Sequence, residues 1–185
     1  FGPSVSMSEE SIQVSSKRFE FISDSSIIKN DNFQFDLSSI AKGFAVDSVS
    51  RILLAAGKNN FLIDIGGEII INGSQHNQPW AIGIQDPTSM NNSSIINIFG
   101  NDFLAVATSG EYRNFKYNDD GEMTSHTFNP ISKTSIPDKT YSVSVISSVP
   151  SMQAYALATA LNVIGPVKVM EFANEKDLTV REIVP

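Results

Sequence analysis

The feature that most constrains the fold of this chain is a series of short apolar runs separated by turn-forming residues. Each run has the length of a strand, and most are bounded by Gly, Asn, Asp or Pro. Asn72-Gly73 is a strong signal for a tight turn. We expect strands at 18–22, 61–65, 68–71, 80–84, 94–98, 103–107, 141–146 and 178–183.

Helical periodicity interrupts this series in three places. Small and apolar residues at spacings of three and four predict one face of an amphipathic helix; they are Ala41, Ala45, Val49, Ile52 and Ala56. A second helix is expected at 150–163, started by Pro150 or Ser151, and a third at 167–173. Because the helices flank the strands instead of alternating with each of them, the pattern predicts an α+β fold with a mixed, largely antiparallel sheet.

Turn and cap residues set the expected helix ends. Ser38 or Ser39 can cap the first helix, and Gly57 follows it where a left-handed cap belongs. Gly165-Pro166 is expected to stop the second helix.

Length and charge exclude several classes of protein. The 185 residues are enough for one domain with its own core, and their net charge of −7 argues against nucleic acid as a partner. The sequence has no cysteine, which excludes disulfides and thiolate sites, and no apolar run or signal peptide indicates a membrane span or export.

Asp36 to Gly43 leads into the first helix and has two interpretations. The N-terminus of a helix with a nearby lysine, Lys42, suits an anion such as phosphate. The same residues are also typical of an ordinary capped helix with a solvated lysine.

Two glycine-containing segments are also open to two interpretations. Gly66-Gly67, followed by Glu68, would let a ligand approach the backbone or would simply form a hairpin. Thr108-Ser109-Gly110 with Tyr112 would line a ring-shaped ligand or form a polar turn beside a core tyrosine.

The two remaining segments are Ser125 to Pro130 and the second helix. His126 is a structural histidine or a group that positions a substrate oxygen and handles its proton. Tyr155 and Thr159 are four residues apart and share a helix face, in a helix that is otherwise typical of an alanine-rich core element.

Taken in order, these segments resemble the ApbE family of FAD:protein FMN transferases. Asp36 to Asp47 is similar to its Asp-Leu-Ser/Gly-x-Ile-Ala-Lys-Gly-x-Ala-x-Asp motif, and Gly66 to Glu68 to its Gly-Gly-Glu/Asp motif. The resemblance spans about residues 33–166 and continues through the Pro-Trp, Thr-Ser-Gly-x-Tyr, Ser-His-x-x-Asn-Pro and Ser-Val-x-Val segments, which begin at Pro79, Thr108, Ser125 and Ser142.

The resemblance implies an ApbE-like fold, with residues 1–185 as one flavin-transferase-like domain that lacks the N-terminal portion of the family. It implies transfer of FMN from FAD to a threonine hydroxyl of a target protein, with Mg²⁺ as the metal and AMP as the product. The catalytic positions would be His126, Lys42 and Thr159. The flavin-binding positions would be Gly66, Gly67, Glu68, Thr108, Ser109, Gly110, Tyr112 and His126.

The implied metal site departs from the family pattern. Its positions are the Ser39 carbonyl, the Thr159 hydroxyl and Tyr155, which stands where the family has an aspartate. A neutral phenol is a poor substitute for a carboxylate, so we expect weakened or lost Mg²⁺ binding. Gln153 and Lys133 are further departures. The alternative function is therefore a catalytically impaired FAD-binding or partner-binding homologue without the metal, or a chain with no flavin affinity.

The resemblance also implies partners and a location. Relatives act on a threonine of an acceptor protein in a membrane redox complex. They lie in the bacterial envelope outside the cytoplasm, in the periplasm or held at the membrane by an N-terminal anchor, which this sequence does not contain.

Overall fold

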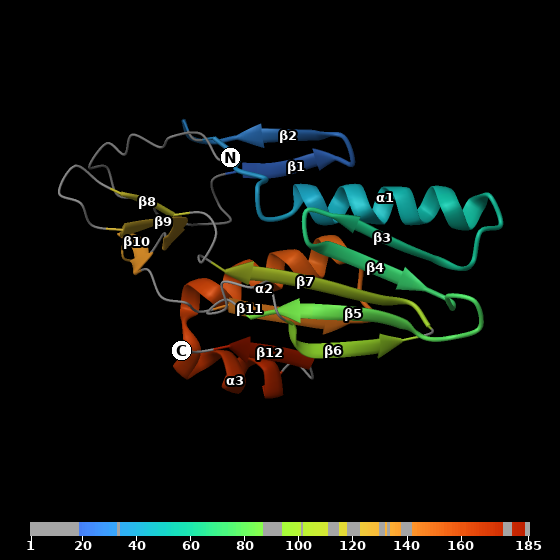
Figure 1. The fold of residues 1–185 in the computed structure, drawn as a ribbon. Coiled ribbons are helices and arrows are strands. Elements are labelled where there is room, and N and C mark those ends of the chain that lie inside the picture. Colours follow the sequence, from blue (N-terminus) through green and yellow to red (C-terminus); the bar gives the residue numbers. More distant parts are fainter. Residues whose placement is uncertain are drawn as a thin grey trace.

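The computed structural model describes residues 19–32, 34–86, 94–100, 102–110, 115–117, 123–129, 132, 134–137, 142–175 and 179–183. The central element is a five-stranded sheet in the order β12-β11-β7-β4-β3, in which every neighbouring pair is antiparallel. Its strands are β3 (Phe61–Ile65), β4 (Glu68–Asn72), β7 (Leu104–Gly110), β11 (Ser142–Ser147) and β12 (Thr179–Ile183). Figure 1 shows these strands side by side.

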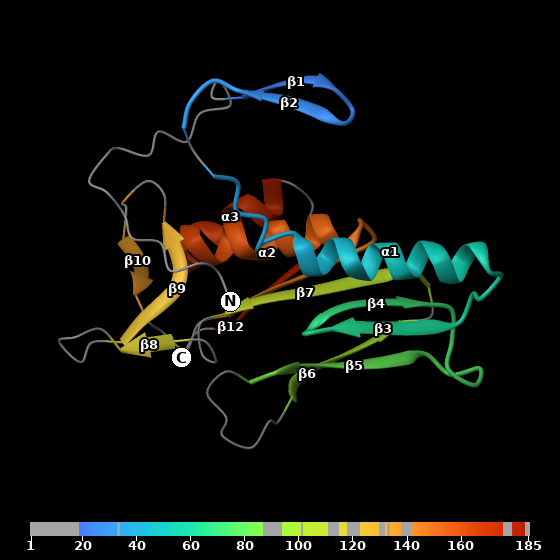
Figure 2. The ribbon, with the colours of Figure 1, turned by 90° about the horizontal axis from the view of Figure 1, so that it is seen from above.

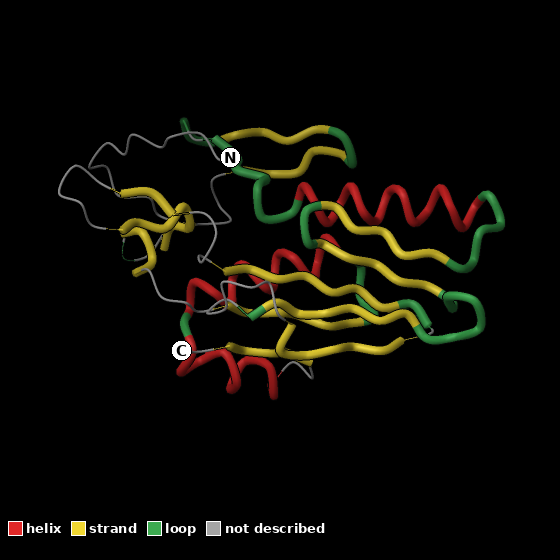
Figure 3. Tube along the Cα trace, viewed as in Figure 1, coloured by secondary structure: helices red, strands yellow, loops and turns green. Residues whose placement is uncertain are grey.

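Three helices and three small sheets complete the described fold. The helices are α1 (Ala41–Ala55), α2 (Ser151–Ile164) and α3 (Pro166–Glu175). The small sheets are β1–β2 (Phe19–Ser23, Ser26–Lys29), β5–β6 (Trp80–Gln85, Ser94–Gly100) and β10-β9-β8 (Thr134–Pro137, Met123–Asn129, Phe115–Tyr117). Figure 3 distinguishes the helices from the strands by colour. The α+β prediction is confirmed.

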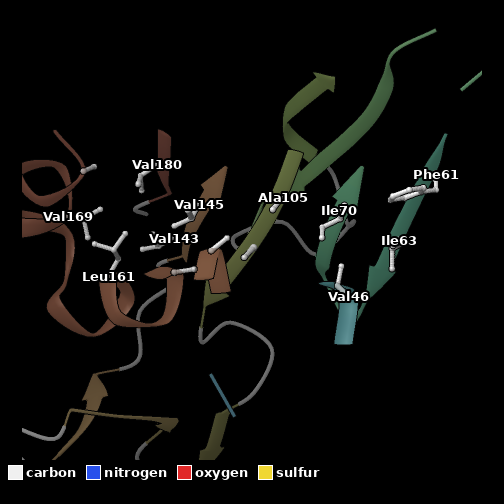
Figure 4. Packing of buried hydrophobic residues seen from close by; sticks show 14 residues of the cluster. Val46, Phe61, Ile63, Ile70, Ala105, Val143, Val145, Leu161, Val169 and Val180 are labelled. Carbon is white, nitrogen blue, oxygen red and sulfur yellow. The ribbon is translucent and has the colours of Figure 1, made fainter. Parts of the chain in front are cut away.

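The helices lie on one face of the five-stranded sheet and the β5–β6 ribbon lies on the other (Figure 2). Alternation of side chains along each strand divides the core in the same way. Ile70, Ala105 and Val143 pack toward the helices, as Figure 4 shows for the larger of the two clusters. Ile71 and Val106 pack toward β5–β6 with Ile82 and Ile84. We call these the helix face and the ribbon face of the sheet.

The predicted core face of α1 is wrong. Val49 and Ile52 are exposed by 38% and 67%, whereas the buried residues of this helix are Gly43, Val46, Asp47 and Ser50. The inner face contains small and polar residues because α2 approaches closely there. Apolar periodicity therefore pointed to the outer face of the helix.

The C-terminal cap of α1 is the one predicted from the sequence, whereas the N-terminal cap is not. Neither Ser38 nor Ser39 caps its start: the N-cap position is Ile40, without a side-chain hydrogen bond. At the other end Gly57 has a φ of +71°, and the amides of Gly57 and Lys58 bond the carbonyls of Leu54 and Leu53. This is the double hydrogen bond of a Schellman cap.

The tight turn predicted at Asn72-Gly73 lies a few residues further along. Gly73 has a positive φ of 62°, but the two-residue turn is His76-Asn77, where both φ values are positive (49° and 64°) and Gln75 pairs with Gln78. Two successive positive φ values are typical of a type I′ turn.

None of the helices in the described residues has the length and apolar character that a membrane crossing requires.

Candidate functional site

Lys42, Gly66, Glu68 and Tyr155 meet at one corner of the fold, although they come from three separate regions of the chain: α1, the β3–β4 hairpin and α2. The Lys42 ammonium donates hydrogen bonds to the Gly66 carbonyl at 3.2 Å and to Glu68 Oε1 at 2.7 Å. It also lies 4.6 Å from the centroid of the Tyr155 ring, within the range of a cation–π contact. We call these four residues the Lys42 cluster. Figure 1 shows the start of α1 close to the turn between β3 and β4.

The turn between β3 and β4 presents the Gly66 carbonyl to Lys42. Gly66 and Gly67 have φ values of +61° and +91° and join the paired residues Ile65 and Glu68. Both values lie in the left-handed region, which only glycine enters without strain. Asp64 Oδ1 accepts the Gly67 amide at 2.9 Å and closes the turn. The hairpin interpretation of Gly66-Gly67 is therefore confirmed, and the ligand interpretation stays a prediction.

Burial controls the charge of the cluster. The Glu68 side chain is 0% exposed, and its burial raises the pKa of that carboxyl to about 7 against the lowering effect of Lys42. Burial also lowers the pKa of Lys42, but the hydrogen bond and charge of Glu68 outweigh it and hold that pKa above its ordinary value. The Lys42 side chain is 41% exposed. The cluster therefore presents a cation at the surface with its acid behind it.

Tyr155 and Thr159 lie on α2, one turn apart, and both are half-buried. Burial raises the pKa of the Tyr155 phenol, with the nearby charge of Lys42 acting in the opposite direction. The phenol is consequently neutral at pH 7. Ala154 and Ala158, which are fully buried, confirm that α2 is also an alanine-rich core helix.

Two residues of the motif from Asp36 to Asp47 have structural roles that the sequence analysis did not predict. Asp47 caps α2 from the neighbouring helix: its two oxygens accept the amides of Ser151 and Met152 at 2.8 and 2.9 Å. A Cβ on Gly43 would lie 2.5 Å from the Met152 Cα, so only glycine allows this approach of α1 to α2. The signal in the sequence was Pro150, an N-cap residue whose side chain cannot bond the free amides.

The start of α1 offers fewer free amides than the anion interpretation assumed. The Ser38 amide donates to Asp36 Oδ1 at 2.8 Å, and the amides of Ile40 and Ala41 both donate to the Leu37 carbonyl. The hydrogen bond from Ser38 lowers the pKa of Asp36. An anion at this corner would therefore interact first with the Lys42 side chain.

Thr108, Ser109 and Gly110 end β7 at the same end of the sheet as the Gly66-Gly67 turn, because β4 and β7 are antiparallel. Alternation from Val106 places Thr108 on the ribbon face, where its hydroxyl lies 2.7 Å from that of Ser144. Glu68 shares the helix face with Ile70. Thr108 and the Lys42 cluster therefore lie on opposite faces of the sheet.

The remaining predicted positions are only partly described. His126 lies in β9, but its side chain is outside the described residues, and Tyr112 is outside them entirely. Ser39 lies half-buried in the turn before α1.

The donors at the implied metal site do not fit Mg²⁺, which prefers carboxylate oxygens. Ser39, Tyr155 and Thr159 would offer a carbonyl, a neutral phenol and a hydroxyl. The nearby carboxylates of Asp36, Glu68 and Asp64 each hold another partner. Among the described residues, no three His, Asp or Glu side chains are grouped in a way that could hold a metal ion.

Comparison with known proteins gives one consistent family. The ApbE family model matches residues 3–182. An FAD:protein FMN transferase of Haemophilus influenzae is 36% identical over 151 residues, which is 80% of this chain. The structure of the Pseudomonas stutzeri flavinyl transferase ApbE superimposes with a TM-score of 0.76 at 32% identity, and that of the Thermotoga maritima ApbE protein with 0.79 at 27% identity.

Each of those two structural matches covers 91% of this chain. The chain itself spans 43% of the Haemophilus protein and 51% and 54% of the two solved chains, about half the length of its relatives. The match of the family model runs over nearly the whole sequence and agrees with the superposed folds. The chain belongs to the ApbE family.

Proposed function

We propose that this chain binds FAD and transfers FMN from it to a threonine hydroxyl of an acceptor protein, with release of AMP. The observation that carries the proposal is the Lys42 cluster. It joins the lysine of one family motif to Gly66 and Glu68 of another through direct hydrogen bonds. Relatives described as FAD:protein FMN transferases match 80% of the chain, which supports the same reaction.

In this reaction the acceptor oxygen forms a bond to the phosphorus of the FMN half. The bond between that phosphorus and the bridging oxygen breaks, and AMP leaves with the bridging oxygen. The enzyme mainly positions the pyrophosphate and balances its negative charge. The Lys42 ammonium would supply that charge, with Thr159 beside the phosphates. His126 would orient the acceptor hydroxyl and take up the proton that the hydroxyl releases.

The implied partners and location belong to the same proposal. The acceptor would be a protein of a membrane redox complex, and the reaction would take place in the bacterial envelope outside the cytoplasm. Family membership is the support for both statements.

A transfer assay tests the proposal. The full chain is incubated with FAD, MgCl₂ and a peptide that contains the acceptor threonine, at enzyme concentrations equal to that of the peptide. We expect the peptide to gain the mass of one FMN and AMP to appear in equal amount. An unlabelled peptide together with unchanged FAD would reject the proposal.

Tyr155 favours a second candidate, an FAD-binding homologue that does not transfer FMN. A neutral phenol stands where the family has a carboxylate, and the ammonium of Lys42 lies against its ring. This candidate predicts that the chain binds FAD in calorimetry but leaves the peptide unlabelled. Binding followed by labelling would exclude it.

A further inference from the structure

Three neighbouring residues hold the partly exposed Lys42 ammonium. It donates hydrogen bonds to the Gly66 carbonyl and to Glu68 Oε1. Tyr155 lies on another side, with its ring centroid 4.6 Å from the ammonium, and a side-chain hydrogen bond between the two residues helps to raise the pKa of Lys42. Contacts from three elements therefore fix this charge in place.

Within the part of the chain that the structure describes, the space beside the ammonium is open on the side of the β3–β4 turn. Among those residues, a Cβ built on Gly67 would meet no heavy atom within 4 Å, and one built on Gly66 would meet only Lys42 Cδ, at 3.5 Å. A phosphate group can therefore approach this turn closely. Because the carboxylate of Glu68 is fully buried behind Lys42, an incoming anion meets the cation first.

The same geometry is unfavourable for a divalent cation. A metal bound at the Tyr155 hydroxyl would have no anionic ligand there and would lie close to the positive charge of Lys42. The nearby carboxylates already have partners, since Glu68 pairs with that lysine and Asp36 accepts the Ser38 amide.

From these contacts we propose that the Lys42 ammonium, held by Glu68 and Tyr155, binds the pyrophosphate of FAD in place of a divalent metal. The inference rests on the proposed function, since it takes FAD as the ligand. It adds that FAD binding by this chain is independent of Mg²⁺.

The test is a calorimetric titration of the full chain with FAD, carried out once with EDTA and once with excess MgCl₂. We expect dissociation constants that agree within about twofold in the two buffers. Affinity that rises about tenfold or more with MgCl₂ would overturn the inference and leave the proposed function intact. Failure to bind FAD in either buffer would reject both.

Variants assign the effect to Lys42. The double variant Lys42→Gln with Glu68→Gln removes both charges, so no buried charge is left without a partner. We expect it to bind FAD about tenfold or more weakly, because the positive charge that attracts the phosphate is lost. Lys58→Gln, which neutralises an exposed lysine at the other end of α1, is the control and should bind as the unmodified chain does. Equal affinities of the double variant and the control would contradict the proposal.

Tyr155 supplies the converse test. Tyr155→Phe retains the ring below Lys42 and should still bind FAD equally in EDTA and MgCl₂. Tyr155→Asp introduces an anionic oxygen ligand and should make FAD binding stronger in MgCl₂ than in EDTA. If Tyr155→Phe became dependent on Mg²⁺, the ring would not have the role that we assign to it, and the inference would fail.

Discussion

Glu68 is fully buried, with only one of its two carboxylate oxygens paired. Oε1 accepts the hydrogen bond from Lys42, while Oε2 has no hydrogen-bond partner among the described residues. A buried oxygen without a partner disfavours the ionised acid, which is why burial raises the pKa of Glu68 to about 7. The other charged or titratable groups around it are Asp64 on β3 and Tyr155 on α2.

The raised pKa predicts how stability changes with pH. The unfolded acid releases its proton near pH 4.5 and the folded acid near pH 7, so the folded state binds more protons between these values. The contribution of Glu68 to the free energy of unfolding is therefore fully present below pH 4.5. It is lost as the pH rises through 7, and the loss is at most about 3 kcal/mol.

Urea denaturation at pH 5 and pH 8 measures this loss against Glu68→Gln. The glutamine retains an acceptor for Lys42 but does not titrate in this range. We expect the unmodified chain to lose stability relative to the variant between the two pH values. A difference between the two proteins that is the same at pH 5 and pH 8 would contradict the assigned titration.

At the scale of elements, the junction of α1 and α2 depends on Asp47. Replacing Asp47 by alanine leaves the amides of Ser151 and Met152 without acceptors at a buried helix end. We expect Asp47→Ala to reduce the free energy of unfolding by about 2 kcal/mol or more. Asp24→Ala removes the same charge from the exposed β1–β2 turn and should have little effect. Similar losses in the two variants would show that the cap is not the cause.

Gly43 tests the same junction through packing. In an exposed helix interior, alanine is more favourable than glycine by about 1 kcal/mol. At Gly43 the added methyl group would collide with the backbone of Met152, so we expect Gly43→Ala to destabilise the protein by about 1–3 kcal/mol. Thermal unfolding measures the change, with Ala41→Ser at an exposed helix position as the control. A stabilised Gly43→Ala variant would mean that the helices are not in close contact there.

The same junction explains what the sequence could and could not predict. The strands at 61–65, 68–71 and 80–84, and all three helices, were predictable because turn residues delimit their runs. The inner face of α1 was not, because close approach to α2 requires Gly43 and the polar cap Asp47 in place of large apolar residues. The Ser38 cap failed because α1 begins at Ala41, so that Ile40 occupies the N-cap position two residues beyond Ser38.

The candidate site was partly predictable for a related reason. Lys42, Gly66 and Glu68 were singled out as motif residues, but their mutual contacts depend on a hairpin and a helix that are 24 or more residues apart in sequence. Thr108 was grouped with them, yet strand alternation places it on the ribbon face. The local sequence identifies the candidate residues, but the face of the sheet on which each one lies depends on the tertiary fold.

At the scale of the whole molecule, the sheet separates two environments. On its helix face, α1 and α2 bring the Lys42 cluster together at one end. On its ribbon face, the end of β7 carries the Thr108–Ser144 hydrogen bond. A flavin dinucleotide is long enough to contact more than one element, but its pyrophosphate should lie on the helix face beside Lys42.

Hydrogen–deuterium exchange of the full chain with and without saturating FAD tests this placement most directly. We expect FAD to slow exchange in peptides covering the start of α1 and the β3–β4 turn, at residues 38–47 and 64–68. Exchange in α3, on the far side of α2, should be unchanged. If bound FAD left residues 38–47 and 64–68 unprotected and slowed exchange only elsewhere, the pyrophosphate would not lie beside Lys42.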